Sequence, residues 1–140
     1  MSVTFFTDRD LGHQFPTVLT IAQVNVERHS DHFPATTPDE EWLARVAERG
    51  WVAVTHDSRI RYKPNELAAV IAHNVRLLVL VGKVPHAALA ANFVATLASI
   101  LKFLEGHQPP FIGRIYRASA AELAVNPASP GRVELWYPKR

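Results

Sequence analysis

Apolar positions in this chain gather into short runs that have the length of buried β-strands. Two of these runs, Val3–Thr7 and Trp51–Thr55, are followed within two residues by an aspartate. In chain order, the predicted strands are residues 3–7, 24–29, 51–55, 76–81, 111–117 and 132–137. The fourth run is apolar at nearly every position, which is typical of a strand that is buried on both faces.

Amphipathic segments between these runs predict helices. The clearest begins near Pro38, where Thr37 is the predicted N-cap and Glu40 its capping-box partner, with Pro38 as the first helical residue. Gly50 ends this helix. Pro85–Glu105 predicts one long helix rich in alanine and leucine. The other predicted helices are residues 15–22, residues 65–72 and a helical turn at residues 119–123 opened by a capping box of Ser119 and Glu122.

Strands that alternate with helices predict a mostly parallel sheet with helices on both faces, a three-layer α/β/α sandwich. We therefore expect an α/β fold with a single domain over residues 1–140. Its core is expected at about residues 3–105, and residues from about 106 to 140 form a C-terminal strand extension. In sheets of this kind the active site lies at the carboxyl ends of the strands.

Charged residues are unevenly distributed, although the net charge of the 140 residues is only +2. Residues 1–57 contain nine acids and four Lys or Arg, whereas residues 58–140 contain four acids and eleven Lys or Arg. This asymmetry indicates an acidic centre beside a basic surface, with a chance partition of solvated charges as the alternative. The absence of cysteine excludes disulfides and thiolate chemistry.

The apolar segments lack the features of targeting and membrane sequences. The first residues, MSVTFFTDRDLG, have no basic leader and include two aspartates before any long apolar stretch. The stretches around Val75–Val81 and Ala87–Leu104 carry polar interruptions and fall short of the ~20 apolar residues that a membrane span needs. We therefore expect a cytoplasmic protein with no membrane segment.

Three aspartates are expected at one edge of the predicted sheet. Asp8 and Asp57 follow two strands, so they meet if those strands are neighbours. Only Gly50 joins the helix that begins near Pro38 to the strand after it, so helix and strand run antiparallel. The amino end of that helix, which carries Asp39, then reaches the same edge. Taken singly, each aspartate also fits a structural role in a helix cap, at a helix dipole or in a turn.

Carboxylates crowded together raise one another's pKa, and a bound cation relieves their repulsion. Oxygen ligands favour Mg²⁺ or Mn²⁺, which leave open positions for phosphate oxygens and for an activated water. We expect Asp8, Asp39 and Asp57 to hold this metal. Additional candidate ligands are Asp10 and Glu40, and the candidate residues for binding the phosphates of a polyanionic substrate are Arg59, Arg61 and Lys63.

Two segments carry a family resemblance. FFTDRDLG near the start and TPDEEWLARVAERGWVAVTHDSRI downstream resemble the PIN-like superfamily, in particular its compact branch of VapC-type ribonuclease toxins. The resemblance spans roughly residues 4–82, and its most specific part is the block that ends in Thr-His-Asp; RYKPNELAAV after this block strengthens it. The residues beyond Lys83 contribute little.

The resemblance implies a compact PIN-like α/β/α domain and a divalent-metal endoribonuclease, usually restrained by a cognate antitoxin. Asp8 matches the family's acid after the first strand, Asp39 the acid that opens the later helix, and Asp57 the acid of the T-x-D turn. The implied reaction is metal-assisted hydrolysis of an RNA phosphodiester. The chain departs from the family pattern at Phe15–Gln23, where an early helix commonly carries a glutamate and here carries no acid; Asp10, Glu40 and Glu41 are candidates to compensate.

Other interpretations stay open. The missing glutamate favours a PIN-like module that binds RNA or protein without cutting. His29 and His32 have the spacing of metal ligands but lack a further partner, and Lys83 after a strand is a faint echo of a receiver-like domain. The helix predicted at Pro85–Glu105 is largely uncharged outside its sheet-facing side, which suggests a homodimer or an antitoxin as its partner.

Overall fold

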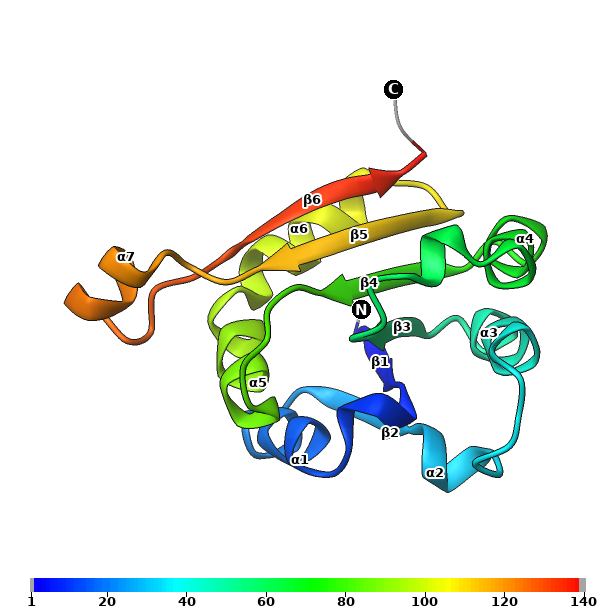
Figure 1. Ribbon diagram of the computed structural model, residues 1–140, viewed down its shortest axis with the longest axis horizontal. Coiled ribbons are helices and arrows are strands. Elements are labelled where there is room, and N and C mark those ends of the chain that lie inside the picture. The colour runs from blue at the N-terminus through cyan, green and yellow to red at the C-terminus, as the bar shows by residue number, and fades with distance from the viewer. Residues whose placement is uncertain (1, 139–140) are drawn as a thin grey trace.

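A computed structural model describes residues 2–138, with the side chain of Arg61 outside the description. One six-stranded sheet in the order β2-β1-β3-β4-β5-β6 lies at its centre (Figure 1). The first five strands in this order are parallel, and β6 runs antiparallel to β5, which confirms the predicted mostly parallel α/β sheet. The strands are β1 (Thr4–Thr7), β2 (Asn25–Arg28), β3 (Val52–Thr55), β4 (Arg76–Leu80), β5 (Phe111–Tyr116) and β6 (Arg132–Tyr137).

Helices cover both faces of the sheet, so the fold is a three-layer α/β/α sandwich. On one face lie α1 (Gln14–Ile21), α5 (His86–Ala95) and α6 (Leu97–Gly106), and on the other lie α3 (Asp39–Glu48) and α4 (Pro64–Ala72) (Figure 1). The remaining short elements are α2 (His29–His32), α7 (Ala120–Val125) and the 3-10 turns η1 (Arg9–Leu11) and η2 (Ile60–Tyr62).

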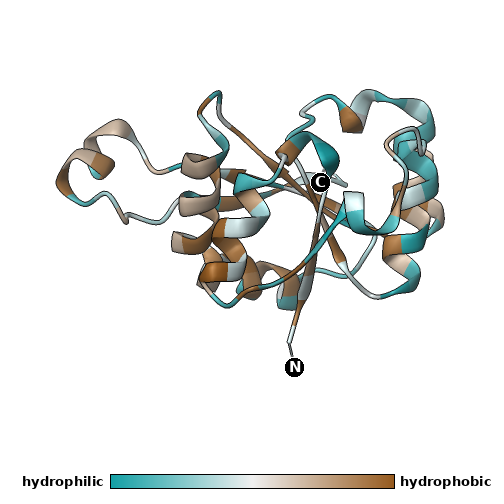
Figure 2. Cartoon of the chain, turned by 90° about the horizontal axis from the view of Figure 1, so that it is seen from below, coloured by the Kyte–Doolittle hydropathy of each residue, from teal (hydrophilic) through white to brown (hydrophobic). Residues whose placement is uncertain are grey.

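The two faces of the sheet carry separate hydrophobic cores because side chains alternate along each strand. Phe5 points to one side, where its ring meets Phe93 of α5 at 5.1 Å between centroids. Phe6 points to the other side and meets Trp42 of α3 at 5.2 Å. Figure 2 shows the hydrophobic strands passing between the two helical layers. Strand β1 is therefore fixed from both sides, together with the residues that follow it.

Strands β1 and β3 are neighbours, as the sequence argument assumed. Thr7 is in register with Val54, and the N–H of Asp8 donates to the carbonyl oxygen of Val54 at 2.9 Å. The carboxyl ends of both strands consequently lie side by side, which is the condition for Asp8 and Asp57 to share an edge.

The single long helix predicted at Pro85–Glu105 is wrong. The segment forms α5 and α6, bent by 66° at Thr96. The hydroxyl of Thr96 donates to the carbonyl of Asn92 and accepts the N–H of Gly131, a residue distant in sequence, so a tertiary contact is made at the bend. Within residues 2–138, no single helix is long and apolar enough to cross a membrane. Helices α5 and α6 have that length and composition only when taken together as this bent pair.

The predicted capping box at Thr37 and Glu40 is also wrong. Pro38 lies outside α3 in an extended conformation, without a side-chain cap, and its carbonyl accepts the N–H groups of Glu41 and Trp42. The helix therefore begins one residue later than predicted, at Asp39. The short helix α2 follows β2, at a place where no helix was predicted.

The small helical turn predicted near residue 120 is confirmed as α7. Its capping box is present: the N–H of Glu122 donates to the Ser119 hydroxyl, and the N–H of Ser119 donates to the Glu122 carboxylate. None of the residues of α7 is buried, and Figure 1 shows the helix extending away from the sandwich.

Candidate active site

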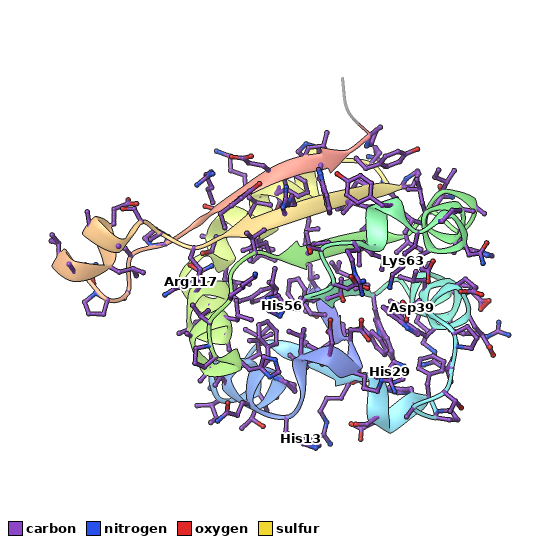
Figure 3. All side chains as sticks on the ribbon, viewed as in Figure 1. His13, His29, Asp39, His56, Lys63 and Arg117 are labelled. Atoms are coloured by element: carbon purple, nitrogen blue, oxygen red, sulfur yellow. The ribbon has the colours of Figure 1, made fainter. Side chains whose placement is uncertain are left out.

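Four aspartates lie at the carboxyl edge of the sheet, where the parallel strands end. Asp8 follows β1 directly, and the turn η1 folds back so that Asp10 lies over the end of β3. Asp57 follows β3, and Asp39 opens α3, whose amino end lies at the same edge (Figure 3). The sequence prediction named these four residues, with Asp10 only as an additional ligand.

The hydroxyl of Thr55 connects three of these aspartates. Its oxygen lies 2.8 Å from Oδ2 of Asp8 and 3.3 Å from Oδ2 of Asp10, and it accepts the N–H of Asp57 at 3.2 Å. Thr55 is fully buried, so this hydroxyl has a fixed position. Because it has one proton, it can donate fully to only one of the two carboxylates.

Asp8 and Asp10 are two neighbouring carboxyl groups whose pKa values no Lys or Arg side chain of the described residues lowers. Burial and then the neighbouring Asp10 raise the pKa of Asp8 to about 7, although hydrogen bonds from Thr55 and Arg9 oppose the shift and Asp39 adds to it. Burial also raises the pKa of Asp10, against hydrogen bonds from the His56 N–H and from Thr55. This pair therefore favours either a bound proton or a bound cation.

Asp57 has the opposite environment. Burial alone would raise its pKa, but hydrogen bonds from the Lys63 ammonium and the Arg59 N–H outweigh this effect and hold the pKa below its ordinary value. The Nζ of Lys63 lies 2.5 Å from Oδ2 of Asp57 and 4.0 Å from Oδ2 of Asp39 (Figure 3). A side chain of the protein itself thus supplies the cation between these two carboxylates.

Asp39 is oriented by its own helix. Its Oδ1 accepts the indole N–H of Trp42 at 2.9 Å, and Trp42 is fully buried in the core. The other oxygen, Oδ2, faces Lys63. This orientation depends on the spacing of residues i and i+3 on one helix face.

The predicted phosphate-binding residues differ in their surroundings. The side chain of Arg59 is 80% exposed, with its Nε 3.7 Å from Oδ1 of Asp57, so most of its donors face solvent. Lys63 is partly exposed and its ammonium is paired with Asp57, and the side chain of Arg61 lies outside the described part of the chain. Phosphate binding by these three residues stays a prediction.

The side chains of Glu40, His29, His32 and His56 have surroundings that differ from those of the four aspartates. Glu40 is exposed in the first turn of α3. The ring of His29 is buried beside Phe6 and Trp42, while His32 contacts Glu27 at 2.7 Å, so the two histidines have different partners. The imidazole of His56 points to the carbonyl oxygen of Gly82 at 2.7 Å, away from the metal-ligand candidates.

The donor chemistry at this edge fits a hard divalent cation held by few protein ligands. Within residues 2–138, no group of three or more His, Asp or Glu side chains is arranged closely enough to hold a metal ion. Mg²⁺, however, is commonly bound through one or two carboxylates together with waters and substrate phosphates. Asp8 and Asp10, which share one hydroxyl and both carry a raised pKa, form such a pair.

The fold and the positions of the four aspartates define a class of protein: an α/β sandwich with acidic residues clustered at the carboxyl ends of its parallel strands. A profile of the family described as "PIN like domain" matches residues 3–82, more than half of the chain. The chain belongs to the PIN-like domain family.

A named relative agrees with this assignment. Over 107 residues the chain is 32% identical to a protein of Mycobacterium tuberculosis (strain ATCC 25618 / H37Rv) named "Putative ribonuclease VapC45". The match covers 69% of this chain and 75% of that protein. No solved structure gives a significant match to the chain. The sequence resemblance to VapC-type PIN-like toxins is therefore confirmed.

Sequence reasoning missed two features of the site. The hydroxyl of Thr55 was treated only as part of a strand, although a buried polar side chain directly before two site residues indicates a role. The pairing of Lys63 with Asp57 was also missed, because the chain folds back through η2 between them. The two residues are six positions apart, and this spacing corresponds to no sequence pattern from which the ion pair could be predicted.

Proposed function

We propose that this protein is a Mg²⁺- or Mn²⁺-dependent endoribonuclease, the toxin component of a type II VapBC-type toxin–antitoxin system acting in the cytoplasm. The observation that carries the proposal is the pair of neighbouring carboxyl groups with raised pKa values, Asp8 and Asp10, at the carboxyl edge. Membership of the PIN-like family and the ribonuclease name of the relative support the same chemistry. At family level the chain is a PIN-domain toxin nuclease, and the metal and partner are the proposed parts.

The metal would be held by Asp8 and Asp10, with Asp39 beside them, and it would activate a water and stabilise charge on the phosphate. The chain itself orients these ligands. Thr55 and the N–H of Arg9 hold Asp8, and the N–H of His56 holds Asp10. Asp57, a predicted ligand, is neutralised by Lys63 and contributes more weakly while that pair persists.

RNA binding is proposed to use the basic residues that flank Asp57. Arg59 is exposed and offers donors for a phosphate beside the carboxylates. Lys63 has a second proposed role: a phosphate that approaches this edge meets an ammonium rather than two bare carboxylates. Lys63 offsets one of the two negative charges of Asp39 and Asp57, and it therefore lowers the electrostatic barrier to binding a polyanion.

The proposed partners are a cognate antitoxin and a second copy of the chain. Helices α1 and α5 contain no Lys, Arg, Asp or Glu, and Ile21 at the end of α1 is 77% exposed. Figure 2 shows the hydrophobic colouring of the helices on this side of the sandwich. An apolar groove runs between the two helices, lined by Val18, Ile21, Ala22, Ala91, Val94, Ala95, Pro127 and Ala128. We assign this groove to the homodimer.

A second candidate function is a PIN-like module that binds RNA or protein with weak or no cleavage. Two observations favour it. Helix α1 carries no acid where the family pattern has a glutamate, and Asp57 is already paired with the Lys63 ammonium. In this alternative the remaining carboxylates bind too little metal to activate water.

The two functions are separated by an RNA cleavage assay. Purified protein is incubated with structured RNAs and Mg²⁺ or Mn²⁺, beside Asp8→Asn and Asp10→Asn. Arg76→Gln serves as a surface control, because Arg76 is exposed at the start of β4, at the opposite edge of the sheet. Cleavage by wild type and Arg76→Gln that falls at least about 100-fold in both aspartate variants supports the nuclease.

Equal cleavage by wild type and Asp8→Asn would contradict the proposed site. RNA binding without cleavage by the wild type, with either metal, would favour the binding module.

A further inference from the structure

The last two strands carry arginine and aromatic side chains on one face. On the side of the sheet that α3 and α4 cover, β5 and β6 extend beyond both helices (Figure 1). Arg114 and Tyr116 share this face with the buried Ile112 because side chains alternate along a strand. Arg132 and Trp136 present the same face on β6.

These side chains form a continuous stack, the arginine–aromatic ladder, made of Tyr62, Trp136, Arg114, Tyr116 and Arg132. The ring of Tyr62 is edge-on to Trp136 at 5.8 Å between centroids. The guanidinium carbon of Arg114 lies 4.3 Å from the ring centroid of Trp136 and 5.5 Å from that of Tyr116. Arg132 completes the ladder, 4.2 Å from the centroid of Tyr116.

The ladder is open to solvent at both ends and keeps unused donor capacity at its centre. Tyr62 is 70% exposed, and the side chain of Arg132 is 62% exposed with one carboxylate contact, to Glu134. The Nε of Arg114 is buried and has no hydrogen-bond partner within the described residues. The guanidinium of Arg114 lies between the rings of Trp136 and Tyr116, and these contacts restrict its orientation before a ligand binds.

The ladder is continuous with the proposed active site. Tyr62 directly precedes Lys63, whose ammonium bonds Asp57. Strand β5 is parallel to β4, and therefore ends at the carboxyl edge where Asp8 and Asp57 lie. The four ladder residues on β5 and β6 lie outside residues 3–82, the part of the chain that the family profile matches.

We propose that the arginine–aromatic ladder binds a single-stranded segment of RNA that flanks the cleavage position; this rests on the proposed ribonuclease function. The ring of Tyr62 is exposed and can stack on a base of any sequence, and the exposed guanidinium of Arg132 can contact the RNA backbone. An open sheet face presents these groups to an unpaired strand, whereas the bases of an A-form duplex are stacked inside it. The ladder contains two arginines, and Glu134 pairs with one of them, so its net charge is positive and suits a polyanion.

The test measures RNA affinity separately from cleavage. A short fluorescein-labelled single-stranded RNA and the duplex of the same sequence are titrated with the full chain in EDTA, over a range of KCl concentrations, with anisotropy as the readout. The variants are Tyr62→Ala, Arg114→Gln and Arg132→Gln. Arg76→Gln, which removes the same charge from the opposite edge of the sheet, is the matched control. Thermal unfolding of each variant verifies folding, and the exposed Tyr62 and Arg132 can be replaced even if Arg114→Gln unfolds.

The ladder predicts different changes in RNA binding for its two exposed side chains, Tyr62 and Arg132. Tyr62→Ala weakens single-strand binding by about 5- to 100-fold with an unchanged salt slope, because it removes stacking. Arg132→Gln lowers the slope of log K against log salt by about 0.7, the value for one phosphate contact on a single strand. Arg76→Gln stays within about twofold of wild type, and duplex binding changes less than single-strand binding.

Three outcomes overturn the proposal. One is single-strand affinity within about twofold of wild type in Tyr62→Ala and Arg132→Gln, with Asp8-dependent cleavage intact; this leaves the ribonuclease function standing and removes only the ladder. Another is an equal loss of affinity for the duplex. A third is unchanged RNA affinity with loss of a co-expressed antitoxin from the purified variant, which assigns the face to protein. A wild type that neither binds nor cuts RNA defeats the proposed function itself.

Discussion

At the scale of single residues, the four edge aspartates divide into two electrostatic pairs. Lys63 neutralises Asp57 and faces Asp39, so one pair is held in its charged form. Asp8 and Asp10 share a hydroxyl, and each has a raised pKa. Asp8, Asp39 and Asp57 were predicted to hold the metal, and this assignment stays a prediction; the two carboxylates with a raised pKa are Asp8 and Asp10.

Asp8→Asn is expected to change how stability depends on pH in metal-free buffer. In the folded wild type Asp8 keeps its proton up to about pH 7, while the unfolded chain releases it near the ordinary value of 3.8. The contribution to stability is therefore fully present below about pH 4 and is lost as pH rises to about 7. With about 1.4 kcal/mol per pKa unit, the loss is at most about 4 kcal/mol, and Asp8→Asn avoids it.

Urea unfolding in EDTA at several pH values between 4 and 8 tests this expectation. The difference between Asp8→Asn and wild type should grow in favour of the variant across this window. Asp31→Asn, on the exposed turn of α2, is the control and should follow the wild type. Parallel stability curves for wild type and Asp8→Asn would contradict the environment assigned to Asp8.

Lys63→Gln is expected to destabilise the fold at neutral pH by about 1–2 kcal/mol, because it removes a charge-assisted hydrogen bond to a largely buried carboxylate. The folded pKa of Asp57 is lowered, so the stabilisation is present above about pH 4 and disappears as pH falls through that folded pKa. The difference between wild type and variant should therefore shrink in acid.

Denaturant titrations at neutral and acid pH measure this effect, with the exposed Lys102→Gln on α6 as the charge control. Mg²⁺ should raise the melting temperature of Lys63→Gln more than that of the wild type, since Asp39 and Asp57 become available. A variant as stable as wild type at neutral pH would show that the Lys63–Asp57 bond contributes nothing.

At the scale of elements, the strands followed from the sequence because their apolar runs are short and bounded by turn residues. The parallel order also followed from the alternation of strands and helices. The bend at Thr96 did not, because the apolar pattern continues through it and its partner Gly131 is 35 residues away. The start of α3 was misplaced by one residue because a strong local capping motif was present but Pro38 stayed extended.

The candidate site was predictable to the same extent. The edge position of Asp8 and Asp57 follows from strand ends, and that of Asp39 from the short connection at Gly50. The distances between the side chains of the site could not be predicted from the sequence. The Thr55 hydroxyl and the Lys63 ammonium each act through contacts that depend on how η1 and η2 fold over the edge.

Thr96→Val is expected to cost about 1–3 kcal/mol, because it leaves the N–H of the half-buried Gly131 without its acceptor, the buried Thr96 hydroxyl. Thr96→Ser keeps the hydroxyl and serves as the matched control, with a smaller loss. Chemical denaturation gives the free energy of unfolding, and amide hydrogen exchange reports the Gly131 N–H directly. Equal stability of the two variants would mean that the hydroxyl does not hold the bend to β6.

At the scale of the whole molecule, the two helical layers have different surfaces. Helix α3 carries three acids in its first turn and basic residues near its end, as expected of a layer that faces water. Helices α1 and α5 carry no Lys, Arg, Asp or Glu, and the apolar groove between them is lined by residues of α1, α5 and the segment after α7, with none of the four edge aspartates among them. Association through this groove would leave the edge accessible to RNA.

Ile21→Glu is expected to convert the proposed homodimer to a monomer, because it places a charge in the apolar groove where a second copy would pack. Sedimentation velocity should give twice the chain mass of 15.6 kDa for the wild type and the single mass for the variant. Ile71→Glu is the matched control: Ile71 is also exposed, at 44%, but lies on α4 across the sheet, so this variant should remain dimeric. A wild type that stays monomeric at high concentration, or an Ile21→Glu variant that stays dimeric, would remove the groove as the dimer interface and leave it for the antitoxin.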